Sequence, residues 1–92
     1  MPIFAVTYKY VDDAELVNQI RPEHRVWLGE LLEKDVLLVS GPLVHRAASL
    51  LVFRAESADE LSQLLDQDPL EVAGVIVERT IEEWNTVFGP WR

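Results

Sequence analysis

The sequence predicts an α+β fold, in which a four-stranded antiparallel sheet carries two helices on one face. Three observations predict it. Four short stretches are rich in β-branched or aromatic residues, and two stretches repeat apolar residues at helical spacing. These stretches follow one another in the order βαββαβ. The chain has 92 residues, so we expect a single domain over 1–92.

The residue pattern in the first half of the chain predicts a strand, a helix and a second strand. Ile3–Tyr10 reads as a strand, one side of which consists of Phe4, Val6, Tyr8 and Tyr10. A helix is expected from Pro22 to about Lys34, because proline suits the first helical position. The residues before it, 16–20, are ambiguous between a loop and a preliminary helical turn. The short apolar run Val36–Ser40 predicts a buried strand that ends at Gly41-Pro42.

The second half predicts a strand, a helix and a strand. Ser49–Ala55 is expected to pair antiparallel with the preceding strand, because the link between them is short. Ser57 and Glu60 have the spacing of a capping box, so a helix begins there and ends before Pro69. A short helical turn follows, and Gly74 is a candidate for its end. The strand Val75–Ile81 precedes a tail over 82–92 that contains three large aromatic residues.

The order βαββαβ is that of the ferredoxin-like fold. Two helices cover one face of its sheet, yet the predicted strands carry apolar residues on both faces. Leu50 and Leu51 are adjacent, as are Ile76 and Val77, and adjacent strand residues point to opposite faces. We therefore expect a homodimer in which the two open sheet faces pack together, a dimeric α+β barrel.

Composition restricts the class of partner. Sixteen acidic residues against eight basic ones give a net charge of −8, which disfavours nucleic acid and anionic membrane surfaces. The chain has no cysteine, and no stretch approaches the length of a membrane span. We expect a cytoplasmic protein whose partner is a small-molecule ligand.

Two ionisable residues lie on apolar helix faces and are the candidate catalytic pair. His24 shares a face with Trp27, Leu28 and Leu31, and Asp68 continues the spacing of the second helix from Leu61 through Leu64 and Leu65. A carboxylate beside an imidazole orients the ring and selects one tautomer, as general acid–base catalysis requires. The alternatives are a core histidine with satisfied hydrogen bonds and an aspartate that only caps a helix. Asp35, at the end of the first helix, is a weaker partner for His24.

The substrate-binding candidates are Arg21, Ser40, Gly41 and Pro42. Gly41 lets a ligand approach the backbone, whose N–H suits a carboxylate or an oxyanion, although a plain turn explains the same residues. Arg21 suits an anionic substrate, or alternatively an acidic neighbour. His45 and Arg46 follow in a connection, where exposed residues usually have no role in a site.

Metal and cofactor chemistry have little support. Two separated histidines without cysteine do not form a metal-ligand set, and the four glycines do not cluster as a phosphate-binding loop. A nucleophile elbow is absent as well. We expect neither a metal nor a cofactor.

Three short motifs resemble the YciI-like (YCII-related) family. They are Arg21-Pro22-Glu23-His24, the strand end Leu38-Val39-Ser40-Gly41-Pro42, and Asp68-Pro69-Leu70 followed by Ala73-Gly74-Val75. The resemblance implies a ferredoxin-like α+β dimer, related to muconolactone isomerases and small dimeric monooxygenases. It also implies a histidine and an aspartate proposed as a catalytic pair, which correspond here to His24 and Asp68.

The residues and the resemblance together predict a small cofactor-independent enzyme. His24 would transfer a proton on a small carboxylated or lactone-like metabolite, and Asp68 would orient His24. Isomerase, lyase or dehalogenase, and hydrolase reactions all remain open. The alternatives are a metabolite-binding or regulatory module without catalysis, and a cofactorless monooxygenase acting on an electron-rich aromatic substrate.

Overall fold

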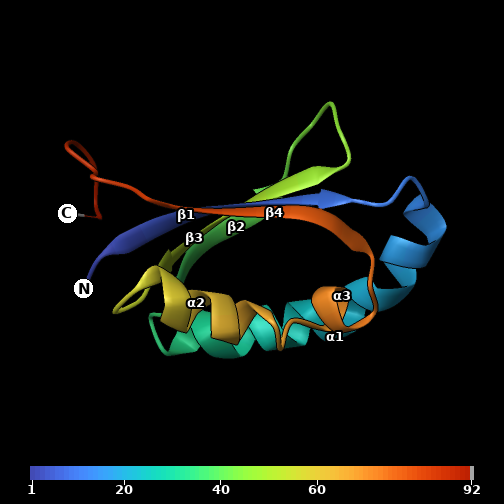
Figure 1. The fold of residues 1–92 in the computed structure, drawn as a ribbon, viewed down its shortest axis with the longest axis horizontal. Coiled ribbons are helices and arrows are strands. Elements are labelled where there is room, and N and C mark those ends of the chain that lie inside the picture. The colour runs from blue at the N-terminus through green and yellow to red at the C-terminus, as the bar shows by residue number, and fades with distance from the viewer. Residues whose placement is uncertain (92) are drawn as a thin grey trace.

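The computed structural model of the 92-residue chain describes residues 1–91. Its elements in chain order are β1 (Ile3–Tyr10), α1 (Ala14–Glu33), β2 (Leu37–Pro42), β3 (Ala48–Arg54), α2 (Ala58–Leu65), α3 (Pro69–Val72) and β4 (Ile76–Glu83). The strands form one antiparallel sheet in the order β2-β3-β1-β4, and the three helices lie on one side of it (Figure 1). This is the ferredoxin-like arrangement that the sequence predicts.

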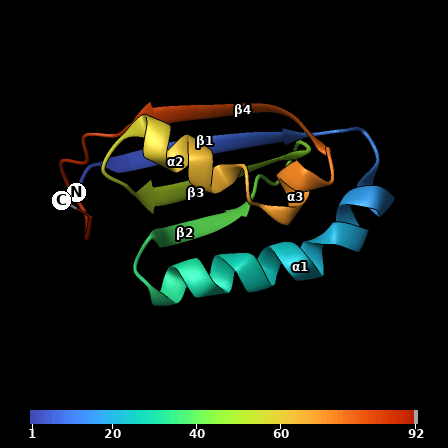
Figure 2. The same cartoon turned by 60° about the horizontal axis from the view of Figure 1, so that its bottom comes forward.

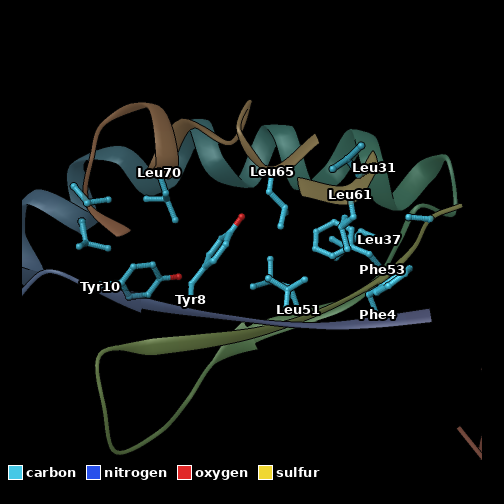
Figure 3. Close-up of a cluster of buried hydrophobic side chains, with 14 residues drawn as sticks. Phe4, Tyr8, Tyr10, Leu31, Leu37, Leu51, Phe53, Leu61, Leu65 and Leu70 are labelled. Atoms are coloured by element: carbon cyan, nitrogen blue, oxygen red, sulfur yellow. The ribbon is translucent and has the colours of Figure 1, made fainter. Parts of the chain in front are cut away.

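The core lies between the sheet and the helices (Figure 3). One side of β1 faces the helices. It consists of the four residues that the alternation in the sequence places together, and all four are buried, namely Phe4, Val6, Tyr8 and Tyr10. Leu51 and Phe53 of β3 meet them from the neighbouring strand, and Leu61, Leu65 and Leu70 meet them from α2 and α3. The alternation of strand side chains therefore brings the hydroxyl-bearing rings of Tyr8 and Tyr10 into this layer.

The predicted start of α1 at Pro22 is wrong. The helix begins at Ala14, eight residues earlier, and the Asp13 side chain caps it by accepting a hydrogen bond from the Leu16 N–H at 3.1 Å. An interior proline removes one helical hydrogen bond and costs about 3 kcal/mol. The cap contributes about 1 kcal/mol, and burial of Val17 in the core contributes ~1.5–3 kcal/mol. Together these contributions offset the proline, and the ambiguous stretch becomes helical.

Strand β2 runs through Gly41 and Pro42 rather than ending before them. Pro42 lies opposite Ser49, which is tolerated because β2 is an edge strand. The pairing of β2 with β3 shifts by one residue between Leu37 and Val39. A bulge of this kind reverses the direction of every later side chain. As a result, Ser40 lies opposite Leu51, on the face of the sheet that the helices cover.

Helix α2 ends at Leu65, so Asp68 is not on its apolar stripe as predicted. Ser57 caps α2 by accepting a hydrogen bond from the Glu60 N–H, as the capping box predicts. Asp68 instead caps the single-turn helix α3, which packs against α1 (Figure 2). Gly74 follows α3 with a φ of +73°, a conformation that glycine adopts readily.

Strands β3 and β4 are each displaced by one or two residues from the prediction. In particular, Glu82 and Glu83 belong to β4 and not to the tail. The predicted tail also includes Arg92, which lies outside the described residues. Across residues 1–91, no helix combines the length and the apolar character needed to cross a membrane.

Among residues 1–91, no helix or strand covers the face of the sheet opposite the helices (Figure 1). Val39 and Leu50 point to this face, because each is adjacent in its strand to a residue that faces the helices. Their exposed fractions are 43% and 41%. This open face therefore carries apolar side chains in contact with solvent.

Candidate acid–base site

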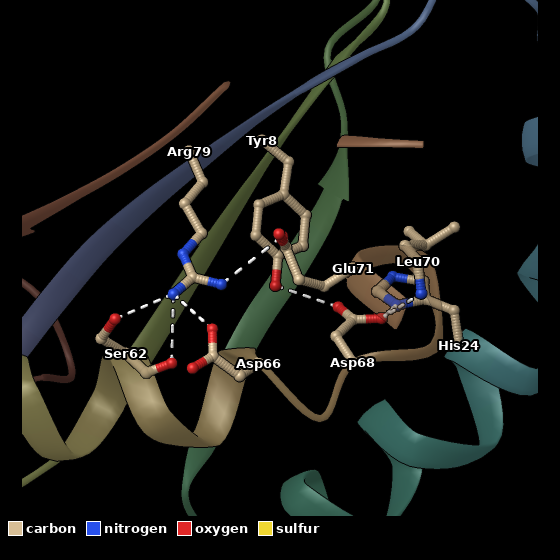
Figure 4. Close-up of polar contacts among 8 residues, drawn as sticks. All are labelled: Tyr8, His24, Ser62, Asp66, Asp68, Leu70, Glu71 and Arg79. Atoms are coloured by element: carbon tan, nitrogen blue, oxygen red, sulfur yellow. Dashed lines mark hydrogen bonds and ion pairs between the residues drawn. The ribbon is translucent and has the colours of Figure 1, made fainter. Parts of the chain in front are cut away.

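His24 and Asp68 meet where α3 packs against α1. The ring Nδ1 of His24 lies 2.8 Å from Oδ1 of Asp68 (Figure 4). His24 is 8% exposed and Asp68 is fully buried. Although Asp68 reaches the site by a different route from the predicted one, the structure brings the two predicted residues into direct contact.

Helix capping and histidine pairing are functions of the same carboxylate. Oδ1 of Asp68 accepts the Leu70 N–H at 2.9 Å as well as facing His24, and Oδ2 accepts the Tyr8 hydroxyl at 3.0 Å. An ionised carboxylate is only an acceptor, so Nδ1 of His24 is the donor in this pair. In the neutral ring, Nε2 is then the unprotonated nitrogen, which is available to accept a proton.

Tyr8 is a member of this network that the sequence analysis did not select. It is fully buried on β1, and burial, followed by the nearby negative charge of Asp68, raises its pKa. Its hydroxyl therefore stays protonated and remains a donor to Asp68. The sequence did contain a feature that could have identified Tyr8, because a tyrosine hydroxyl that points into a core needs a polar partner. The polar residues predicted on that same layer were His24 and Asp68.

A neighbouring network fixes β4 to α2. The Arg79 guanidinium, from β4, donates to the Ser62 hydroxyl and to the Asp66 carboxylate, each at 2.8 Å, and it lies 3.4 Å from Glu71 (Figure 4). These contacts hold α2, and the connection that follows it, against the sheet. They help to fix the chain that leads into Asp68.

A cavity of about 160 Å³ lies beside His24. All four predicted substrate-binding residues, Arg21, Ser40, Gly41 and Pro42, line it together with His24. Asp68 lies behind the ring of His24 and is not part of the wall. Gly41 contributes its backbone to the wall, because it lies opposite Leu50 and a Cβ atom built on it would point to the open face of the sheet, where no atom lies within 4 Å. A cavity of roughly 150 Å³ is enough to hold one benzene ring in a protein interior.

The remaining wall residues were not selected from the sequence. Arg25 and Leu28 come from α1, and Tyr10, Ser49 and Leu51 come from the sheet. The Tyr10 and Ser49 hydroxyls lie 2.7 Å apart and share one hydrogen bond. Burial raises the pKa of Tyr10, and the Ser49 hydrogen bond and the charge of Arg21 act in the opposite direction. The helical spacing of Arg25 and Leu28 from Arg21 was the signal that could have identified them.

The other candidates lie outside this cavity. His45 is exposed, and Arg46 lines a separate cavity of about 200 Å³ that shares Tyr10, Arg21 and Pro42 with the first. Asp35 is exposed and lies 3.8 Å from the Arg54 guanidinium, so it pairs with Arg54 and not with His24. Within residues 1–91, no three histidine, aspartate or glutamate side chains converge as metal ligands.

Comparisons with solved structures find the same fold in other proteins. One is the 5-chloro-2-hydroxyhydroquinone dehydrochlorinase TftG from Burkholderia phenoliruptrix AC1100, in complex with 2,5-dihydroxybenzoquinone. It is 24% identical with a TM-score of 0.80, and the match covers 90% of this chain and 93% of that one. A protein from Agrobacterium tumefaciens is 11% identical with a TM-score of 0.60, over 95% and 94% of the two chains.

The sequence comparisons identify the family of this chain. No curated protein matches the chain significantly. The family model of the YCII-related domain matches residues 1–85, which include all of the helices and strands described above. The chain therefore belongs to the YCII-related domain family.

Proposed function

We propose that this chain is a small-molecule enzyme in which His24 transfers a proton and Asp68 positions His24. The observation that carries this proposal is the buried contact between Nδ1 of His24 and Oδ1 of Asp68. That contact occupies one ring nitrogen and leaves Nε2 for a ligand, and His24 lines a cavity large enough for one ring. A positioned imidazole of this kind accelerates proton transfer by about 10²–10⁴-fold.

Among the reaction types open to one acid–base group, elimination has the most specific support. The similar structure from Burkholderia phenoliruptrix is a dehydrochlorinase in complex with a ring-sized ligand. In an elimination, His24 would take a proton from the substrate through Nε2. The electron pair left behind would form a new double bond, and the leaving group would depart as an anion. The proton on His24 then returns to solvent, so the step needs no cofactor.

Chloride release from 5-chloro-2-hydroxyhydroquinone tests this proposal directly. We expect the wild-type chain to release chloride and His24→Gln to lose about 10²-fold or more of that rate. His45→Gln is the matched control, because it replaces the other histidine, which is exposed and outside the cavity. Chlorinated phenols and small lactones extend the same comparison to the isomerase and hydrolase reactions.

The alternatives give different results in the same experiment. If 5-chloro-2-hydroxyhydroquinone, the chlorinated phenols and the lactones bind but are all recovered unchanged, the chain is a metabolite-binding module and the catalytic proposal is overturned. Turnover that consumes oxygen identifies the monooxygenase. Equal rates in wild type and His24→Gln remove His24 from the mechanism, whatever the reaction is.

We also propose that the chain works as a homodimer joined through the open face of the sheet. The exposed apolar side chains Val39 and Leu50 on that face support this proposal, because burial of such a surface is favourable. The His24 cavity lies on the opposite side of the sheet, so this contact would leave its lining unchanged.

A further inference from the structure

We propose that Arg21 and Arg25 form an anion-binding clamp in the His24 cavity, which takes a ring-sized molecule with one carboxylate or phenolate group. The clamp rests on the proposed function only in that His24 would act on the bound molecule. Binding itself requires no catalysis.

The helix places a charged end and an apolar end along one wall. The residues of α1 that line the cavity are Arg21, His24, Arg25 and Leu28, which follow one another at helical spacing along a single stripe. A ligand lying along this stripe would place its anionic group at the two guanidinium groups and its apolar part against Leu28 and Leu51. His24 would then face the middle of the ligand.

The His24 cavity carries two positive charges that no acidic side chain of residues 1–91 balances. Acidic residues outnumber basic ones by sixteen to eight, yet no carboxylate among residues 1–91 forms an ion pair with Arg21 or Arg25. Arg54 and Arg79 each have an acidic partner, whereas Lys9, Lys34 and Arg46 also have none; among the described cations, Arg21 and Arg25 are the two that line the His24 cavity. Like charges four residues apart also destabilise a helix slightly. Two unpaired cations on one cavity wall of an acidic protein indicate that an anion binds between them.

The opposite wall offers an independent hydrogen-bond donor. Ser49 is 92% buried, since its exposed fraction is 8%, and it lines the cavity from β3. The hydroxyls of Ser49 and Tyr10 share one hydrogen bond, so one of their two protons has no acceptor among residues 1–91. A buried donor without a partner is unfavourable. An oxygen atom of a bound anion would satisfy it.

Paired probes of equal size test the clamp. Benzoate and benzamide have the same shape, but benzoate alone is charged. We expect calorimetric titration to show benzoate binding about tenfold more tightly than benzamide, because a hydrogen bond to a charged group is stronger than one to a neutral group. 4-Nitrophenolate replaces benzoate in a parallel titration. Preference for one of the two anions identifies the oxyanion as a carboxylate or a phenolate.

Arginine variants test whether the preference for benzoate over benzamide comes from Arg21 and Arg25. Arg21→Gln and Arg25→Gln should each reduce benzoate affinity by about tenfold and leave benzamide binding unchanged. Lys34→Gln is the matched control, because it removes one exposed positive charge just beyond α1 and away from the cavity. Equal affinities for the two probes in wild type, absence of binding by either anion, or an equal loss in Lys34→Gln would each overturn the clamp.

The clamp and the catalytic proposal can fail separately. His24→Gln should still prefer benzoate over benzamide, because it retains both arginines. If that preference persists while no compound is ever transformed, the clamp stands and the catalytic proposal fails. If an anionic substrate is turned over at the same rate and with the same KM by wild type and both arginine variants, the clamp fails and the catalytic proposal stands.

Discussion

The hydroxyl of Tyr8 donates a hydrogen bond to Oδ2 of Asp68, a residue 60 positions later in the chain. This bond joins the central strand β1 to the start of α3, and the other oxygen of Asp68 joins α3 to α1 through His24. One buried carboxylate thus connects three elements. Since each of its contacts has a different partner, single substitutions can separate its structural contribution from its effect on His24.

Asp68→Asn should retain the fold but no longer hold the His24 ring in a single tautomer. Asparagine has nearly the same shape and is an equally good helix cap, so the contact with the Leu70 N–H can persist. The neutral amide, however, no longer favours a proton on Nδ1 of His24. We expect ¹⁵N NMR to detect the Nδ1–H tautomer in wild type and a mixture of tautomers in the variant, with a rate loss of about 10²-fold or more.

The control for this substitution is Asp66→Asn, two residues earlier. Asp66 is exposed and pairs with Arg79 rather than with His24, so its replacement should leave the His24 tautomer unchanged. An unchanged tautomer and rate in Asp68→Asn as well would mean that Asp68 is only a helix cap.

Tyr8→Phe should destabilise the protein by about 1–3 kcal/mol, because it leaves Oδ2 of the buried Asp68 without a donor. Tyr10→Phe is the matched comparison. It removes a buried hydroxyl that contacts Ser49 instead of Asp68, and we expect a smaller loss of about 0.5–1.5 kcal/mol. Urea unfolding measures both values. A loss that is no larger in Tyr8→Phe than in Tyr10→Phe would show that Oδ2 of Asp68 does not need the Tyr8 hydroxyl as a donor.

Stability should fall at alkaline pH because of Tyr8. Burial and the nearby charge of Asp68 raise the pKa of Tyr8 above its ordinary value of 10.0. Above that pH the unfolded chain loses this proton while the folded chain keeps it, so the unfolded state is favoured as pH rises. The expected slope is up to about 1.4 kcal/mol per pH unit, and below pH 10.0 this tyrosine adds no pH dependence.

Urea unfolding across the alkaline range measures this slope. Tyr8→Phe should unfold with a shallower pH dependence than wild type, although not a flat one, because burial also raises the pKa of Tyr10. Identical slopes in the two proteins would mean that Tyr8 ionises as easily in the folded chain as in the unfolded one.

The fold was predictable because local patterns and packing agree along most of the chain. The alternation in β1 identifies its buried side, and the capping box at Ser57 marks the start of α2. The start of α1 was not predictable from Pro22, because the tertiary burial of Val17 outweighs the local preference of proline. Local signals therefore gave the order of the elements but not all of their boundaries.

The candidate site was predictable only in part, for a similar reason. His24 and Asp68 were visible as ionisable residues placed among apolar ones. The inward direction of Ser40 depends on the bulge between Leu37 and Val39, and a continuous apolar run gives no indication of a one-residue shift. The hydrogen bond from Tyr8 to Asp68 depends on how β1 and α3 pack, which no local pattern reports.

Ser40→Ile should weaken ligand binding without weakening the fold. The larger side chain would enter the cavity, because Ser40 lines it and lies opposite Leu51 on the face that the helices cover, and isoleucine suits a strand better than serine does. Gly41→Ala is the control, because Gly41 lies opposite Leu50, so its added methyl group would point to the open face, where no protein atom lies within 4 Å. Benzoate titration should show a loss of affinity in Ser40→Ile alone. Equal affinity in both variants would place the ligand away from β2.

Leu50→Glu should separate the proposed dimer into monomers. Leu50 lies on the open face of the sheet with an exposed fraction of 41%, and burial of a carboxylate in an apolar interface is strongly unfavourable. Sedimentation equilibrium should give twice the chain mass for wild type and the single chain mass for this variant. Val26→Glu is the matched control, because Val26 is an exposed apolar residue of α1, on the other side of the molecule. A monomeric wild type would show that the open face does not join two copies. A dimer that survives Leu50→Glu but not Val26→Glu would move the interface to the helices.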